Sequence, residues 1–124
     1  MSGRKTTLLY ATIPTQSGAT AIDTRSTPTS VQYLDNISFV ANTTGTLVGT
    51  LKVWGANQYV DPTKGQVVTN WTEAFNSQPT IDLTNPNITI NMNQFSPQWI
   101  ALQWVPTSGT GNITVEMLAK QVGA

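Results

Sequence analysis

The fold is decided by residues 99–120, which read Trp-Ile-Ala-Leu-Gln-Trp-Val-Pro-Thr-Ser-Gly-Thr-Gly-Asn-Ile-Thr-Val-Glu-Met-Leu-Ala-Lys. In the second half, every other residue is apolar, which is typical of a strand with one buried face: Ile113, Val115, Met117 and Ala119. Residues 99–105 are apolar nearly throughout, as in a strand covered on both sides. The Pro and Gly residues between these two runs favour a turn. The stretch therefore predicts a closing β-hairpin.

Outward from this stretch, short apolar or alternating runs recur between turns rich in Gly, Pro, Asn and Asp. They lie at residues 6–13, 31–40, 47–54, 67–75, 80–83 and 87–92. No amphipathic helix of useful length is visible. We therefore predict an all-β, single-domain β-sandwich, jelly-roll-like, of about seven or eight antiparallel strands. Residues 31–124 form the predicted sandwich core, and residues 1–30 a first strand followed by an extended arm.

Two segments of the chain have similar sequences. Residues 37–53 and residues 100–118 each contain an apolar strand, a Thr-(Thr/Ser)-Gly-Thr turn and an alternating strand. Two such units could form the cores of the two halves of a sandwich. Chance recurrence of a good turn sequence is the alternative reading.

The N-terminal arm carries small residues and little to bury. We predict that a neighbouring chain holds it, with partner contacts from the first strand at Leu8, Leu9, Tyr10 and Ile13. The alternative is that this segment adds an edge strand to its own sheet.

The composition excludes several classes of function. The chain has no cysteine and no histidine, which removes thiolate sites and the commonest general base. Six acidic and six basic residues balance, so no basic field for nucleic acid or an anionic membrane is expected. No apolar run is long enough for a signal peptide or a membrane span, and we expect the chain to stay soluble in a cytoplasm. The carboxylates are scattered, so we predict no enzyme, no cofactor and no metal, with a Ca²⁺ ion near Asp61 left open.

The aromatic residues offer a different kind of site. Trp54 and Tyr59 flank a polar loop and are the candidate glycan-binding residues, because flat rings stack on sugars. Trp99 and Trp104 have opposite parity in one strand and so face opposite sides. If only one face is buried, one of these two is left for a partner, and both are counted among the partner-binding candidates.

The closing stretch resembles a pattern found in small virion proteins of bacteriophages. Those proteins tend to end with an apolar strand, a Thr-x-Ser-Gly-x-Gly turn, an alternating strand and a Gly- or Lys-rich tail. Their middle segment is similar to residues 44–57 here, Thr-Gly-Thr-Leu-Val-Gly-Thr-Leu-Lys-Val-Trp-Gly-Ala-Asn. The resemblance covers roughly Val31 to Lys120. Gly55-Ala56-Asn57 stands where a Ser-Asn-Asp-like turn is common, which leaves the following loop unassigned.

This resemblance implies a non-enzymatic virion structural protein, assembled in the host cytoplasm. The expected role is a capsid decoration or cement protein, a minor capsid protein that binds and stabilises the phage shell. The expected partners are the major capsid protein or other virion proteins and further copies of this chain. The alternative is a carbohydrate-binding or host-adhesion module of a spike or fibre.

Overall fold

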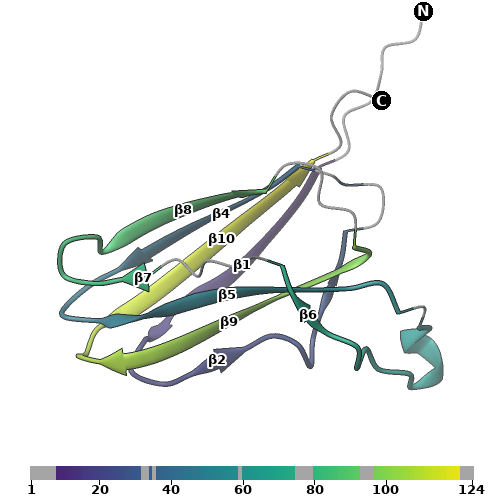
Figure 1. Ribbon diagram of the computed structural model, residues 1–124, viewed down its shortest axis with the longest axis horizontal. Coiled ribbons are helices and arrows are strands. Elements are labelled where there is room, and N and C mark those ends of the chain that lie inside the picture. Colours follow the sequence, from purple (N-terminus) through teal and green to yellow (C-terminus); the bar gives the residue numbers. More distant parts are fainter. Residues whose placement is uncertain are drawn as a thin grey trace, which may run out of the picture.

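The computed structural model describes residues 8–31, 34, 36–58, 60–74, 80–92 and 97–120, and omits the side chains of residues 8–10 and 62. Two antiparallel sheets pack face to face (Figure 1). Sheet A has the order β1 (Leu8–Ser17), β10 (Asn112–Lys120), β4 (Asn36–Thr43), β8 (Asn87–Met92). The centre of sheet B is the pair β9 (Trp99–Ser108) and β5 (Val48–Ala56). On one side, β9 also pairs with the short strands β2 (Ile22–Asp23) and β3 (Thr29–Ser30). On the other side, β5 also pairs with the short strands β6 (Thr72–Glu73) and β7 (Thr80–Ile81).

The strand pairing is nested. β1 pairs with β10, β2 and β3 with β9, β4 with β8, and β5 with β6 and β7. The first strand thus pairs with the last strand. Each later strand from the N-terminal half pairs with the next earlier strand from the C-terminal half. This order wraps one long antiparallel ribbon around a single core, which is the jelly-roll arrangement. The predicted all-β sandwich is confirmed, and the strand count exceeds the prediction because two of the eight strand positions are each split into two short pieces.

The predicted closing hairpin is wrong. β9 and β10 belong to different sheets, and the turn between them crosses from sheet B to sheet A. The reason is that each strand carries its own buried stripe. Ile100, Leu102 and Trp104 of β9 are buried in the same core as Ile113 and Val115 of β10. Placing the strands in opposite sheets lets each stripe cover the other, whereas a hairpin would put both on one face.

The two similar segments of the sequence contain two equivalent turns between the sheets, and these turns are in contact. The β4–β5 turn also crosses between the sheets, and it lies against the β9–β10 turn. Thr44 N–H donates to Asn112 O at 2.9 Å, and Thr46 N–H donates to Thr110 O at 2.8 Å. In return, Asn112 N–H donates to Thr44 Oγ1 at 3.0 Å. The two Thr-(Thr/Ser)-Gly-Thr turns are therefore one interlocked structure that closes one end of the sandwich.

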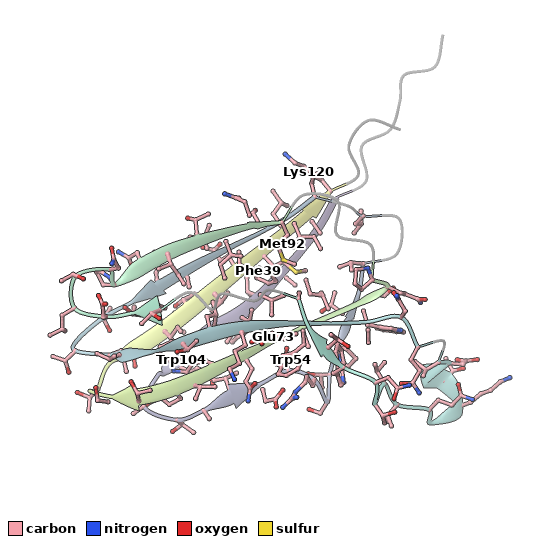
Figure 2. All side chains as sticks on the ribbon, in the orientation of Figure 1. Phe39, Trp54, Glu73, Met92, Trp104 and Lys120 are labelled. Carbon is pink, nitrogen blue, oxygen red and sulfur yellow. The ribbon has the colours of Figure 1, made fainter. Side chains whose placement is uncertain are left out.

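Among the residues that the structure describes, no polar or charged side chain is buried, so the core between the sheets is apolar. Its fully buried members include Leu47, Leu51, Ile81, Ile113 and Trp104, and the exposed fraction of Trp104 is 0 %. Figure 2 shows Phe39 and Met92 directed between the sheets, while Lys120 points away from them. Trp104 Nε1–H donates to Gly18 O at 2.7 Å, so the one polar atom of this buried side chain is satisfied.

Trp99 and Trp104 do face opposite sides of sheet B, as their parity predicts. The outer side is nevertheless covered by the same chain, because the loop of residues 57–71 folds over it. Trp99 is buried there with Ala56, Val60 and Val68. Gln58 ties the loop down: its carbonyl accepts from Trp99 Nε1–H at 3.0 Å, and its Oε1 accepts from Thr69 N–H at 2.7 Å. Neither tryptophan is left for the partner contact predicted for it.

The described part of the N-terminal thirty residues is also built into this chain. β1 pairs with β10 from Leu8↔Lys120 to Ser17↔Asn112, with a register shift between Ile13 and Gln16, around Pro14. Ile13 packs against the chain's own core. The edge strand named as the alternative is thus the arrangement observed, because β10 and β9 offer backbone hydrogen-bond partners to β1 and to β2 and β3. The side chains of Leu8, Leu9 and Tyr10 lie outside the described residues, so their predicted partner contacts stay predictions.

Candidate functional site

The two outer faces of the sandwich carry different sets of side chains. The outer face of sheet A is made by residues that alternate with the core residues of β1, β10, β4 and β8. We name the sheet A face by its exposed or half-exposed members: Thr12, Ser38, Val40, Asn42, Thr89, Asn91, Thr114, Glu116, Leu118 and Lys120. Within this set only Glu116 and Lys120 are charged.

Two large apolar side chains lie within the sheet A face. Val40 is 38 % exposed and Leu118 is 40 % exposed. Val40 is paired with Glu116, and Leu118 with Ser38, in the β10–β4 ladder, so the two apolar residues are diagonal neighbours. Short hydroxyl and amide side chains surround them, and Thr15 and Thr114 share a hydrogen bond at 2.5 Å between their hydroxyl oxygens. Glu116 and Lys120 flank Leu118 at alternate positions of β10, so the sheet A face combines two exposed apolar side chains, short hydroxyl and amide side chains and one charge of each sign.

The outer face of sheet B instead carries an ordered polar cluster. Arg25 forms a bidentate pair with Asp23, with Nη2 at 2.7 Å from Oδ2 and Nε at 3.0 Å from Oδ1. The Arg25 guanidinium lies over the Trp54 ring, 4.6 Å from its centroid. Trp54 Nε1–H in turn donates to Gln103 Oε1 at 3.1 Å. Four side chains from β2, its following loop, β5 and β9 thus hold one another in place.

A groove of about 520 Å³ lies beside this cluster. It is lined by the loop after β2 on one side and the loop of residues 57–71 on the other, with Arg25, Val60, Gln66, Val67, Val68 and Trp99 among its residues. Val67 stands on its rim with 65 % of its surface exposed. Gln66 is held by its own backbone contact, since its Oε1 accepts from Asp61 N–H at 2.7 Å.

The candidate glycan residues are placed differently from one another. Trp54 is half-buried in the cluster, with one ring face occupied by Arg25. Tyr59 lies outside the described residues. Sequence reasoning did not single out Arg25, Val67 or Val68, because Arg25 is far along the chain from the two valines. One signal was available for part of the cluster: Asp23 and Arg25 are the only charged residues between Lys5 and Asp35.

The Asp23–Arg25 pair perturbs both groups. The pKa of Asp23 is lowered, chiefly by the side-chain hydrogen bonds from Arg25, against a smaller opposing effect of burial. The pKa of Arg25 is raised by the same pair. Because the pKa of Asp23 is lower in the folded state, the pair stabilises the fold at pH values above the unfolded-state pKa of about 3.9. This stabilisation is lost as the pH falls through the folded-state pKa.

We therefore expect Asp23→Asn to lower the free energy of unfolding at neutral pH by less than about 1 kcal/mol, since the pair is partly exposed. The difference between the two proteins should shrink as the pH falls below about 3.9 and through the lowered pKa of Asp23, because the carboxylate then becomes protonated in both states. Urea unfolding followed by circular dichroism over a series of acidic pH values measures it. Asp82, whose pKa is also lowered, chiefly by a hydrogen bond from Thr84, is present in both proteins and cancels. A difference that persists undiminished in acid would contradict the electrostatic account.

The described residues offer no metal centre and no membrane-spanning helix. Among them, no group of three or more Asp or Glu side chains gathers as ligands. Asp61, where a Ca²⁺ ion was left open, uses Oδ1 to accept from Thr63 N–H at 3.0 Å and from Thr63 Oγ1–H at 2.6 Å, as a turn cap does. No helix in the described ranges has the length and hydropathy to cross a bilayer.

Comparison with known proteins adds no relative. No protein-family model matches the chain, and no curated protein matches it. The resemblance to phage virion proteins therefore stays a prediction, and function has to be proposed from the two outer faces.

Proposed function

We propose that this chain is a non-enzymatic structural protein of a phage particle, a decoration or cement protein that binds the capsid shell and stabilises it as a homo-oligomer. The sheet A face is the observation that carries this proposal. It is a surface of four paired strands, with the diagonal neighbours Val40 and Leu118 both exposed and with one acidic and one basic residue among its members.

Such a face is suited to docking one rigid body on another. Apolar surface removed from water contributes about 25 cal/mol per Å² before the costs of association. The surrounding Ser, Thr and Asn side chains can exchange hydrogen bonds with water for hydrogen bonds with a partner, at a lower desolvation cost than charged groups. Jelly rolls occur in viral capsid proteins and also in lectins, so the fold supports a virion role without specifying it.

The low charge of the sheet A face also predicts how attachment responds to salt. Screening weakens contacts between exposed charges and leaves apolar contacts in place. Attachment to the shell should therefore survive molar NaCl. Release of the protein from shells on raising NaCl alone would contradict docking through this face.

The decisive test replaces Leu118 with glutamate. We expect Leu118→Glu to lose at least about tenfold in affinity for shells of the source virus, because it replaces exposed apolar surface of the contact with a second carboxylate beside Glu116 that must lose its water on docking. Leu83→Glu is the matched control, since Leu83 is 66 % exposed and lies in the turn between β7 and β8. Co-sedimentation with purified shells measures binding, and circular dichroism confirms that both variants fold.

Two outcomes would overturn the proposal. One is wild-type protein that does not bind the shells. The other is a Leu118→Glu variant that binds as tightly as the wild type. The oligomeric state is measured separately by light scattering of the free protein, and a strict monomer at all concentrations would remove the homo-oligomer from the proposal.

A further inference from the structure

We propose that the groove on the outer side of sheet B binds a neutral saccharide. This site goes beyond the proposed structural role and does not depend on it. Its walls come from the loop after β2 and from the loop of residues 57–71, which meet over Trp99. Its volume of about 520 Å³ falls within the range of small-molecule sites.

The floor of the groove is apolar. Val60, Val68 and Trp99 are buried there together, and Trp71 packs against them. The Trp99 indole N–H is already bonded to Gln58 O at 3.0 Å, and the Trp71 N–H to Val68 O at 3.2 Å. Both indole donors are therefore satisfied. The carbon surface of the groove consists of the small exposed parts of Val60, Val68 and Trp99, 7–8 % of each, together with Val67 at the rim. The C–H face of a pyranose ring is a surface that fits such a floor.

The wall of the groove supplies fixed polar groups. Arg25 has five N–H donors, and its contacts with Asp23 use Nε and Nη2. Those contacts, together with the Trp54 ring beneath, hold the guanidinium in one position and leave further N–H groups for a ligand. Fixing a polar group in advance reduces the entropy lost when a ligand binds. Sugar hydroxyls are acceptors that this arrangement can bind.

The charge of the groove favours a neutral ligand. Asp23 offsets the charge of Arg25 at a distance of 2.7 Å between Oδ2 and Nη2. Arg25 is the only charged residue that lines the described groove. A phosphate or acidic sugar would meet an arginine already paired with a carboxylate, so it would gain little from its charge. A neutral hexose loses nothing by this pairing.

The groove also has a defined position relative to the sheet A face. The groove belongs to the outer side of sheet B and the sheet A face to the outer side of sheet A, so the two lie on opposite sides of the sandwich. If the proposed docking through sheet A holds, the groove points away from the shell. Only this last step rests on the proposed function.

The test uses the purified full chain on an array of neutral and acidic oligosaccharides, followed by titration calorimetry with the best neutral ligand. We expect neutral saccharides to bind, and Val67→Asp to raise the dissociation constant at least about tenfold by placing a charge on the apolar rim. Leu83→Asp is the control, because Leu83 and Val67 have nearly equal exposure, 66 % and 65 %. Arg25→Gln should weaken binding as well, because it removes the fixed donors.

Each outcome of these experiments either supports or contradicts the saccharide site. Binding of neutral saccharides that is lost in Val67→Asp and kept in Leu83→Asp supports the site. Absence of any neutral ligand, a preference for acidic ligands, or binding unaffected by both groove variants would overturn it. Leu118→Glu separates the two proposals, since it should lose the shell and keep the saccharide, whereas Val67→Asp should do the reverse.

Discussion

Replacing Trp104 with alanine is expected to lower the free energy of unfolding by about 3–5 kcal/mol. Trp104 is the largest fully buried side chain of the core, and its exposed fraction is 0 %. Its removal leaves a cavity at the centre of β9 and leaves Gly18 O without the indole N–H, which lies 2.7 Å away in the wild type. Gly49 shows how closely the ring is packed, because a Cβ at that position would lie 2.5 Å from Trp104 Cη2.

Small domains have about 5–15 kcal/mol of stability in total, so the Trp104→Ala protein should be partly unfolded at 37 °C or show a strongly reduced melting temperature. Urea unfolding monitored by far-UV circular dichroism measures the loss. Trp54→Ala is the control, because Trp54 is only half-buried on the outer face of sheet B, and its cost should be about 1–2 kcal/mol. Equal losses in the two variants would mean that Trp104 does not anchor the core as described.

The second large effect is expected at the interlocked turns. Gly109 has φ +84°, and a Cβ there would lie only 1.9 Å from Thr46 O in the neighbouring turn. Gly109→Ala therefore combines left-handed backbone strain of about 1–2 kcal/mol with a forced separation of the two turns. Separation weakens bonds such as Thr110 N–H to Thr46 Oγ1 at 3.1 Å. The total cost should reach about 2–4 kcal/mol.

Gly65→Ala isolates the strain from the collision. Gly65 has φ +74°, and nothing lies within 4 Å of the Cβ that alanine would add. Its cost should stay near about 1–2 kcal/mol, the strain alone. Amide hydrogen exchange provides a local readout: the N–H groups of Thr44 and Thr46 should lose protection in Gly109→Ala and keep it in Gly65→Ala. If both variants lose the same stability and protection, the two turns do not act as one structure.

The candidate site was only partly accessible from the sequence. Trp54 could be singled out because an aromatic residue beside a polar loop is a local feature. The groove could not, because Arg25, Val67 and Trp99 come from three distant segments and only the folding of two loops over sheet B brings them together. The sheet A face was missed for a related reason, since an exposed Leu118 or Val40 is unremarkable until its strands are shown to be neighbours.

The sequence by itself determined the class of structure and the faces of its strands. Alternation in β10 and opposite parity of Trp99 and Trp104 are local, because side chains of a strand must point to alternating sides. Only the tertiary structure decided which strands share a sheet and what covers each face. β9 and β10 were separated into opposite sheets because their buried stripes cover each other across the core, and the loop of residues 57–71 buried Trp99. These outcomes depend on contacts between residues far apart in the chain, and a local sequence pattern does not predict such contacts.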